Sequence, residues 1–328
     1  MNIRKKSWIA AQWLKLRNPK AYAFYKHKLW LNRLYQPLKE FSALNKRPPG
    51  SNPLKLSDGR YKQINLFHSG NAGDLIYSLP VARAIFEITG LKPNLLLAAD
   101  TPVALQPGTQ HPLGNVMLND DMIQKLVPLL SKQAYLNRVL KHEHQRVDID
   151  LSLFRVCGIQ HNSGSIPRWY FYTTGIYADL GKPWLDCATL TALSNTIVIA
   201  RSTRYHNPLI NYSFLSQYRD LLFVGLESEF ILMQSDIPNL KWYPTNDFLA
   251  VCQVINSCRL FIGNQSLPYA IAEALKVPRL LEVCPASPNV IPEGPGGHDF
   301  YFQQHFEHLV AALAPQNMID RRKVLRGY

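Results

Sequence analysis

A run of small and polar residues, Ser69-Gly70-Asn71-Ala72-Gly73-Asp74, could carry chemistry, because it follows an apolar strand pattern and opens a predicted helix. Its two glycines let the backbone approach a ligand closely. Asp74 has two interpretations. Its carboxylate could cap free N–H groups at the helix start, which the spacing alone favours, or act as a general base toward a substrate. No Gly-Lys-Ser/Thr follows, so the run is not a P-loop.

A second polar segment, Asn264-Gln265-Ser266, lies between a predicted strand and an alanine-rich helix that begins near Leu267 and includes Tyr269. A helix N-terminus presents unpaired N–H groups that suit phosphate. We therefore expect this segment to cradle the pyrophosphate of a donor, with Tyr269 as a further donor contact. The alanines of the helix have a simpler explanation as well, since small side chains allow close packing.

A third segment, Arg201-Ser202-Thr203-Arg204, comes directly after the strand pattern TIVIA. Two guanidinium groups and two hydroxyls at the carboxyl end of a strand suit a phosphate-bearing ligand. The alternative is ordinary charge on an exposed loop. Glu282 ends another predicted strand, where it could hydrogen-bond a ribose or pair with a neighbouring basic residue.

The elements that position these segments alternate along the chain. Short apolar runs predict strands, and each is followed by a helical pattern, including one over Met122–His144. This alternation predicts parallel sheets covered on both faces, and ligands of such sheets bind outside the carboxyl ends of the strands. We expect a basic arm and linker (1–50), two Rossmann-like domains (51–185 and 186–298) and a final segment (299–328) whose helix crosses back to the first domain.

The net charge of +13 is concentrated at the N-terminus. Residues 1–47 hold twelve basic residues and one acid, Glu40, interleaved with aromatic residues. A basic, aromatic-rich helix can lie on an anionic membrane or bind an acidic partner. It can also simply pack on the body of the protein. Nucleic acid is the least favoured partner, because no base-reading module follows.

The two halves together resemble the ADP-heptose:lipopolysaccharide heptosyltransferase group, glycosyltransferase family 9. One match is Gly73-Asp74-Leu75-Ile76-Tyr77-Ser78-Leu79-Pro80, and the other runs over residues 246–283. The resemblance implies the GT-B fold, with two Rossmann-like domains facing a central cleft. It also implies metal-independent, inverting transfer of a sugar from a nucleotide-sugar donor to an acceptor hydroxyl.

The same resemblance implies a role for individual residues. The catalytic base falls on Asp74, and the loop around it (Ser69, Gly70, Asn71 and Gly73) faces the acceptor, a glycan or glycolipid. Diphosphate contacts fall on Ser202, Thr203 and Asn264–Ser266. A nucleoside-contacting acid falls on Glu227 or Glu229. The chain lacks the carboxylate and histidine that the family often has in its second loop, so the sugar stays open.

Two rival functions remain at this stage. The same fold could belong to a non-catalytic binding protein whose basic arm binds an acidic partner, or to an epimerase acting on a nucleotide sugar. No apolar run reaches the roughly 18 residues of a membrane-spanning helix. The five cysteines form no CxxC pair, which favours reduced thiols. We expect a cytoplasmic protein without metal or cofactor. If its basic arm contacts lipid, the protein would be peripheral on the inner face of the membrane.

Overall fold

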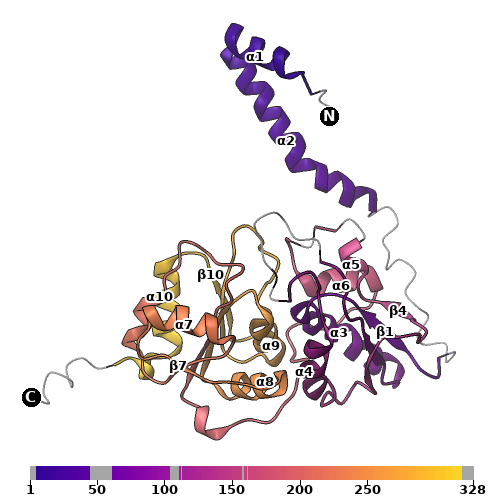
Figure 1. Cartoon of the computed structure of the whole chain (residues 1–328), viewed down its shortest axis with the longest axis vertical. Coiled ribbons are helices and arrows are strands. Elements are labelled where there is room, and N and C mark those ends of the chain that lie inside the picture. The colour runs from indigo at the N-terminus through magenta and orange to yellow at the C-terminus, as the bar shows by residue number, and fades with distance from the viewer. Residues whose placement is uncertain are drawn as a thin grey trace, which may run out of the picture.

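The computed structural model describes residues 5–44, 61–103, 111, 113–156, 159–160 and 162–319, with the backbone alone over 34–44. The body of the molecule consists of two parallel sheets, each flanked by helices, and they lie side by side in Figure 1. The predicted α/β class with two Rossmann-like domains is confirmed.

The first sheet has the strand order β3-β2-β1-β4 and is parallel throughout. Its central strands are short and apolar, and β2 is buried at every position because helices cover both faces. The strands are β1 (Asn65–His68), β2 (Asn94–Leu97), β3 (Val139–Lys141) and β4 (Ile149–Asp150), and the helices are α3 (Ala72–Thr89), α4 (Asp120–Leu130), α5 (Leu153–Val156) and α6 (Ile166–Thr174).

The helix predicted over Met122–His144 is wrong in its second half. The helix α4 ends at Leu130, and the chain then returns as the edge strand β3. Val139 pairs with Leu95 of β2, so the backbone groups at that edge of the sheet are satisfied by β3. The local pattern could not show this, because the partner strand lies some 40 residues earlier.

The second sheet has the order β10-β9-β8-β5-β6-β7, again parallel throughout. Three of its strands, β5, β8 and β9, are buried along their whole length. The strands are β5 (Ile197–Ala200), β6 (Leu221–Phe223), β7 (Lys241–Trp242), β8 (Leu260–Asn264), β9 (Arg279–Glu282) and β10 (Gly297–Phe300), the helices are α7 (Glu227–Asp236), α8 (Phe248–Ser257), α9 (Leu267–Leu275) and α10 (Gln303–Leu313), and the 3₁₀ turns are η3 (Thr191–Leu193), η4 (Ser213–Gln217) and η5 (Pro315–Asn317).

The helix α10 does not cross back to the first domain, contrary to the prediction for residues 299–328. Phe306 of α10 stacks on Phe300 of β10, with ring centroids 4.0 Å apart. Phe306 also contacts Tyr212 and Phe214, at 4.9 Å each, so it belongs to the core of the second domain. Aromatic burial of this size holds the helix against its own sheet.

The two domains share one continuous hydrophobic core where α3 packs on α9 and α4 packs on α8. The alanines of α9, among them Ala270 and Ala274, are fully buried, and their small size lets the two helices approach closely. Trp184 lies in the connection between the domains. Its backbone N–H donates to the Ala274 carbonyl (2.9 Å) and its indole N–H to the Ile76 carbonyl (3.0 Å).

A buried charge cluster stabilises the second domain beside this junction. The Glu273 carboxylate, 1% exposed, pairs with both Lys276 and Arg279. It also accepts the Glu293 N–H at 3.0 Å, while Arg279 donates to the Pro295 carbonyl at 3.2 Å. Burial lowers the pKa of Lys276 to about 8, although Glu273 opposes the shift. The loop before β10 is thereby attached to the domain core.

The N-terminal residues form two helices, α1 (Trp8–Arg17) and α2 (Pro19–Leu44). Ser7 caps the first, and Asn18 accepts the Ala21 N–H (3.0 Å) at the start of the second. In Figure 1, α1 folds back along α2, and the pair stands away from the body. Among the described residues no helix is both long and apolar enough to cross a membrane.

Glu273→Gln should destabilise the protein by about 3–5 kcal/mol, because it leaves two buried cations without a carboxylate. The measurement is urea unfolding at pH 7. Asp121→Asn is the matched control, since it breaks the exposed pair with Lys125 and should cost about 1 kcal/mol or less. Equal losses in the two variants would contradict a stabilising role for the buried cluster.

Candidate functional site

The first half of the candidate site lies where β1 and β4 end side by side. The loop after β1 leads into α3, and the turn after β4 leads into α5, so Asp74 and Arg155 meet at this edge. The Asp74 carboxylate is 9% exposed and forms an ion pair with Arg155. Gly70 leaves the necessary space, because a Cβ there would lie 3.2 Å from the Arg155 Nε and 3.4 Å from the Asp74 Oδ2.

The capping interpretation of Asp74 does not describe this geometry. The side-chain partner of its carboxylate is Arg155, and no N–H of α3 donates to it. Asn71 occupies the N-cap position, but its Oδ1 accepts from His111 Nε2 (3.0 Å) instead of from the helix. The carboxylate therefore lies beside the N-terminus of α3 without accepting a hydrogen bond from it. Its predicted role as a base is untested by this arrangement.

Two hydrogen-bonded side chains lie beneath the loop. The buried His68 accepts the Gly70 N–H at Nδ1 (3.2 Å), so its proton is on Nε2, which donates to the Tyr170 hydroxyl (2.9 Å). Tyr170 donates in turn to the Asp74 carbonyl (3.0 Å). Burial lowers the pKa of His68 to about 4, and the nearby Asp74 opposes this shift only in part. A neutral imidazole thus holds both ends of the loop.

His111 is a site residue that the sequence did not indicate. Its Nδ1 accepts the Leu113 N–H (3.2 Å), which assigns the Nε2 proton to the bond with Asn71. Burial lowers its pKa, and the positive charges of Arg204 and Arg155 lower it further. His111 therefore lies close to a charged group of each domain, Arg155 of the first and Arg204 of the second. No local motif surrounds it, so sequence patterns gave no signal for it.

The remaining residues of the acceptor-side loop are partly exposed. Ser69 is held by Ser152, whose hydroxyl accepts both the Ser69 N–H (2.8 Å) and its hydroxyl (2.7 Å). Gly73 faces the second domain, because a Cβ there would lie 3.8 Å from the backbone of Leu267. The N-terminus of α3 therefore meets the N-terminus of α9.

The second half of the site lies where β5, β8 and β9 end. Asn264, at the end of β8, is fully buried and holds the loop after β5. Its Oδ1 accepts the Ser202 N–H (3.0 Å), and its Nδ2 donates to the carbonyls of Ser202 (3.0 Å) and Arg204 (2.5 Å). The side chain of Asn264 thus shapes the expected phosphate loop and is not itself free for a ligand.

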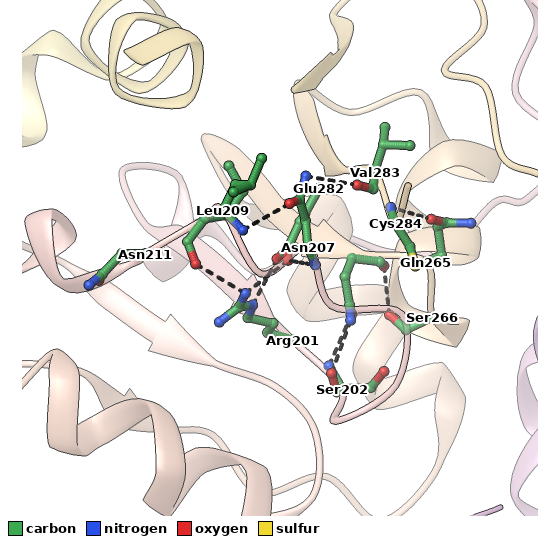
Figure 2. Close-up of polar contacts among 12 residues, drawn as sticks. Arg201, Ser202, Asn207, Leu209, Asn211, Gln265, Ser266, Glu282, Val283 and Cys284 are labelled. Carbon is green, nitrogen blue, oxygen red and sulfur yellow. Dashed lines mark hydrogen bonds and ion pairs between the residues drawn. The ribbon is translucent and has the colours of Figure 1, made fainter. Parts of the chain in front are cut away.

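Arg201 and Glu282 form a buried pair, which decides between the two interpretations of Glu282. Arg201 donates from Nε (2.7 Å) and Nη2 (2.8 Å) to the two carboxylate oxygens, and its guanidinium stacks 4.5 Å from the Tyr212 ring. The Asn207 N–H adds a further bond (2.7 Å), and Figure 2 shows both residues converging on Glu282. Arg201 and Glu282, which were both predicted to contact the donor, therefore bind each other inside the second domain.

Gln265 and Tyr269 are also placed differently from the prediction. Gln265 accepts the Cys284 N–H (2.8 Å) and donates to Ser287 and Asn289, so it organises the loop after β9 (Figure 2). Tyr269 is fully buried in the shared core, with its ring 6.2 Å from that of Phe261. Its position in the first turn of α9 turns it inward, a direction that spacing alone did not show.

Four predicted donor contacts remain partly exposed at this edge: Ser202, Thr203, Arg204 and Ser266. Arg204 forms no ion pair within the described residues, and its buried Nε has no hydrogen-bond partner there. Glu229 accepts the N–H groups of Thr203 and Leu226 (3.3 Å each), so it links this loop to α7, while Glu227 points to solvent.

The two edges together present groups that suit an anion. The N-termini of α3 and α9 adjoin, and helix N-termini carry partial positive charge. Arg204 adds a full positive charge, whereas the charge of Arg155 is balanced by Asp74. In the ranges that the structure describes, no three His, Cys, Asp or Glu side chains are placed to hold a metal ion. The site therefore offers a carboxylate beside a cationic, N–H-rich surface.

This architecture is the GT-B fold of glycosyltransferases. The chain is similar to the glycosyl transferase family 9 protein of Veillonella parvula DSM 2008, with TM-score 0.51 and 12% identity over 83% of this chain and 93% of that one. It is also similar to E. coli heptosyltransferase WaaC with ADP, with TM-score 0.51 and 10% identity over 77% and 100%. Searches with the sequence find no matching family model and no matching curated protein. The likeness confirms the fold that the resemblance implied.

His68 should make the protein less stable as the pH falls from 6.5 to 4. Over this range the unfolded chain binds a proton at His68 that the folded chain does not. This proton uptake lowers the free energy of unfolding by up to about 3 kcal/mol at pH 4. Urea unfolding at pH 7 and pH 4 should show a smaller loss of stability in His68→Gln. The exposed His144→Gln should keep the wild-type loss, and an unchanged loss in His68→Gln would contradict the assignment.

Proposed function

We propose that this protein is a glycosyltransferase that moves a sugar from a nucleotide-sugar donor to an acceptor hydroxyl without a metal and with inversion. The observation that carries the proposal is the buried Asp74 carboxylate at the junction of two helix N-termini, one from each Rossmann-like domain. In parallel sheets, ligands bind at this edge. The fold that the chain shares with glycosyltransferases supports the same conclusion.

In the proposed reaction, the Asp74 carboxylate takes the proton of the acceptor hydroxyl as its oxygen bonds to the anomeric carbon. The bond from that carbon to the diphosphate oxygen breaks, and the nucleoside diphosphate leaves with the negative charge. Arg155 holds Asp74 in place and balances its charge before the transfer. Direct attack by the acceptor from the face opposite the leaving group inverts the anomeric centre.

The leaving diphosphate would lie against the second domain. Arg204 offers a guanidinium that has no ion-pair partner among the described residues, and the hydroxyls of Ser202 and Thr203 lie in the same loop. The start of α9, beside Ser266, offers the N–H groups of Leu267 and Tyr269 to the same region, while Pro268 between them has none. Fixed donors of this kind stabilise developing negative charge and can replace a metal ion in that role.

The donor and acceptor are proposed here as classes only. One structure with a similar fold is described as holding ADP, and it is a heptosyltransferase. An adenosine diphosphate sugar is therefore the first donor to try with this chain, followed by UDP-, GDP-, CMP- and dTDP-sugars. The acceptor class is a glycan or glycolipid hydroxyl.

Asp74→Asn should lower the transfer rate roughly 10²–10⁴-fold, the usual contribution of a general base, while donor binding stays within a few-fold. The measurement combines a thermal-shift titration with each nucleotide sugar and release of nucleoside diphosphate in the presence of a bacterial glycolipid extract. Normal turnover by the variant would show that Asp74 is not the base. The melting temperature without ligand controls for the lost pair with Arg155.

The two arginines of the loop after β5 should behave differently when replaced. Arg204→Ala should weaken nucleoside diphosphate binding at least tenfold with little change in melting temperature, because its charge is free for a ligand. Arg201→Ala should lower the melting temperature instead, because it leaves the buried Glu282 unpaired. Thermal shift with and without the stabilising nucleotide separates the two effects. The reverse pattern would place the diphosphate on Arg201.

The non-catalytic alternative has one observation in its favour, which is the internal use of Arg201, Asn264, Gln265 and Glu282. A binding protein without donor site should show no thermal shift with any nucleotide sugar, although stabilisation grows with the logarithm of ligand excess and millimolar ligand reveals weak sites. An epimerase would give a changed sugar without any acceptor. A donor-dependent product that forms only with acceptor would support transfer.

A further inference from the structure

An exposed apolar and basic surface lies on the N-terminal helix pair, which stands away from the two domains in Figure 1. Three apolar side chains of α1 form a stripe, because Ile9, Trp13 and Leu16 follow the i, i+4, i+7 spacing of one helix face. They are 74%, 57% and 84% exposed, and Trp8 beside them is 76% exposed. Neither α2 nor the body of the protein covers this stripe.

The stripe is surrounded by positive charge. Residues 5–33 contain eight Lys and Arg residues and no Asp or Glu. Several of these cations lie over aromatic rings of the same two helices, as Arg17 does over Trp13 (4.8 Å) and Lys28 over Phe24 (4.4 Å). The surface thus combines exposed apolar rings with a single sign of charge.

The two helices hold this surface in a defined shape. Asn18 separates them, and the Lys6 N–H donates to the Tyr25 hydroxyl (2.9 Å), which joins the residue before the N-cap of α1 to the second turn of α2. In Figure 1 the pair extends away from the two domains. The exposed stripe is therefore accessible to another molecule.

We propose that residues 5–33 bind the surface of an anionic lipid bilayer. The Ile9–Trp13–Leu16 stripe would enter the boundary between headgroups and acyl chains, and the lysines and arginines would contact lipid phosphates. Charge complementarity favours this partner, because a second copy of the same all-basic surface would be repelled. The helices would lie on the bilayer, which suits interfacial helices with basic and aromatic residues. The binding does not depend on the proposed transfer activity.

The test is co-sedimentation of the full chain with vesicles of phosphatidylcholine containing 30% phosphatidylglycerol, against vesicles of phosphatidylcholine alone. Binding should be at least tenfold stronger to the anionic vesicles and should fall at 500 mM NaCl, because salt screens the attraction. Replacing both Trp13 and Leu16 with serine should weaken binding roughly tenfold or more. The exposed Lys20→Gln and Lys26→Gln should each weaken it about fivefold.

Replacing Ile231 and Leu232 with serine is the matched control, because these residues are similarly exposed (59% and 61%) but lie on α7. This variant should bind vesicles as the wild type does. Absent binding, equal binding to both vesicle types, or equal loss in the control would each overturn the proposal. So would light scattering that shows an oligomer which the Trp13/Leu16 variant disrupts without vesicles, since the stripe would then bind a second copy. Circular dichroism checks that the variants keep their helices.

Discussion

The packing of α3 against α9 is the contact on which the rest of this structure depends. It joins two domains into one hydrophobic core, and it requires the small buried alanines of α9 on one side. Because both helices begin at the carboxyl end of a strand, their contact also brings the two strand edges together. The site is thus a consequence of core packing. Asp74 comes close to the second domain only because the helix that carries it packs there.

Each half of the site is supported from below by buried polar groups. In the first domain, His68 and Tyr170 connect the two ends of the Asp74 loop by hydrogen bonds. In the second, Asn264 and Glu282 hold the loop after β5. These groups are buried and bonded, so they give the loops one defined shape. The Arg204 side chain, which is left partly exposed, forms no ion pair among the described residues and takes no part in this organisation.

The charge of the chain is divided between two tasks. At the site the cations are few: Arg155 lies beside the carboxylate of Asp74, and Arg204 forms no ion pair among the described residues. Over residues 5–33, which include α1 and the first half of α2, they occur without any acid, and aromatic rings lie among them. The first pattern suits the recognition of one small anion, and the second suits a broad anionic surface. A protein that transferred sugar to a membrane-bound acceptor would use both.

The fold class and the polar loops could be predicted from the residues alone, because short buried strands followed by helices leave few alternatives to parallel sheets, and strand ends follow from the apolar pattern. Asp74 was indicated by its place after such a strand. The use of each side chain, however, depends on the folded structure. Arg201 and Glu282, which are 81 residues apart, turned out to satisfy each other, and Tyr269 turned inward to the core. The tertiary structure also placed His111 beside Asn71 in the site and packed α10 against the second domain. These outcomes depend on contacts between distant segments, which local patterns do not contain.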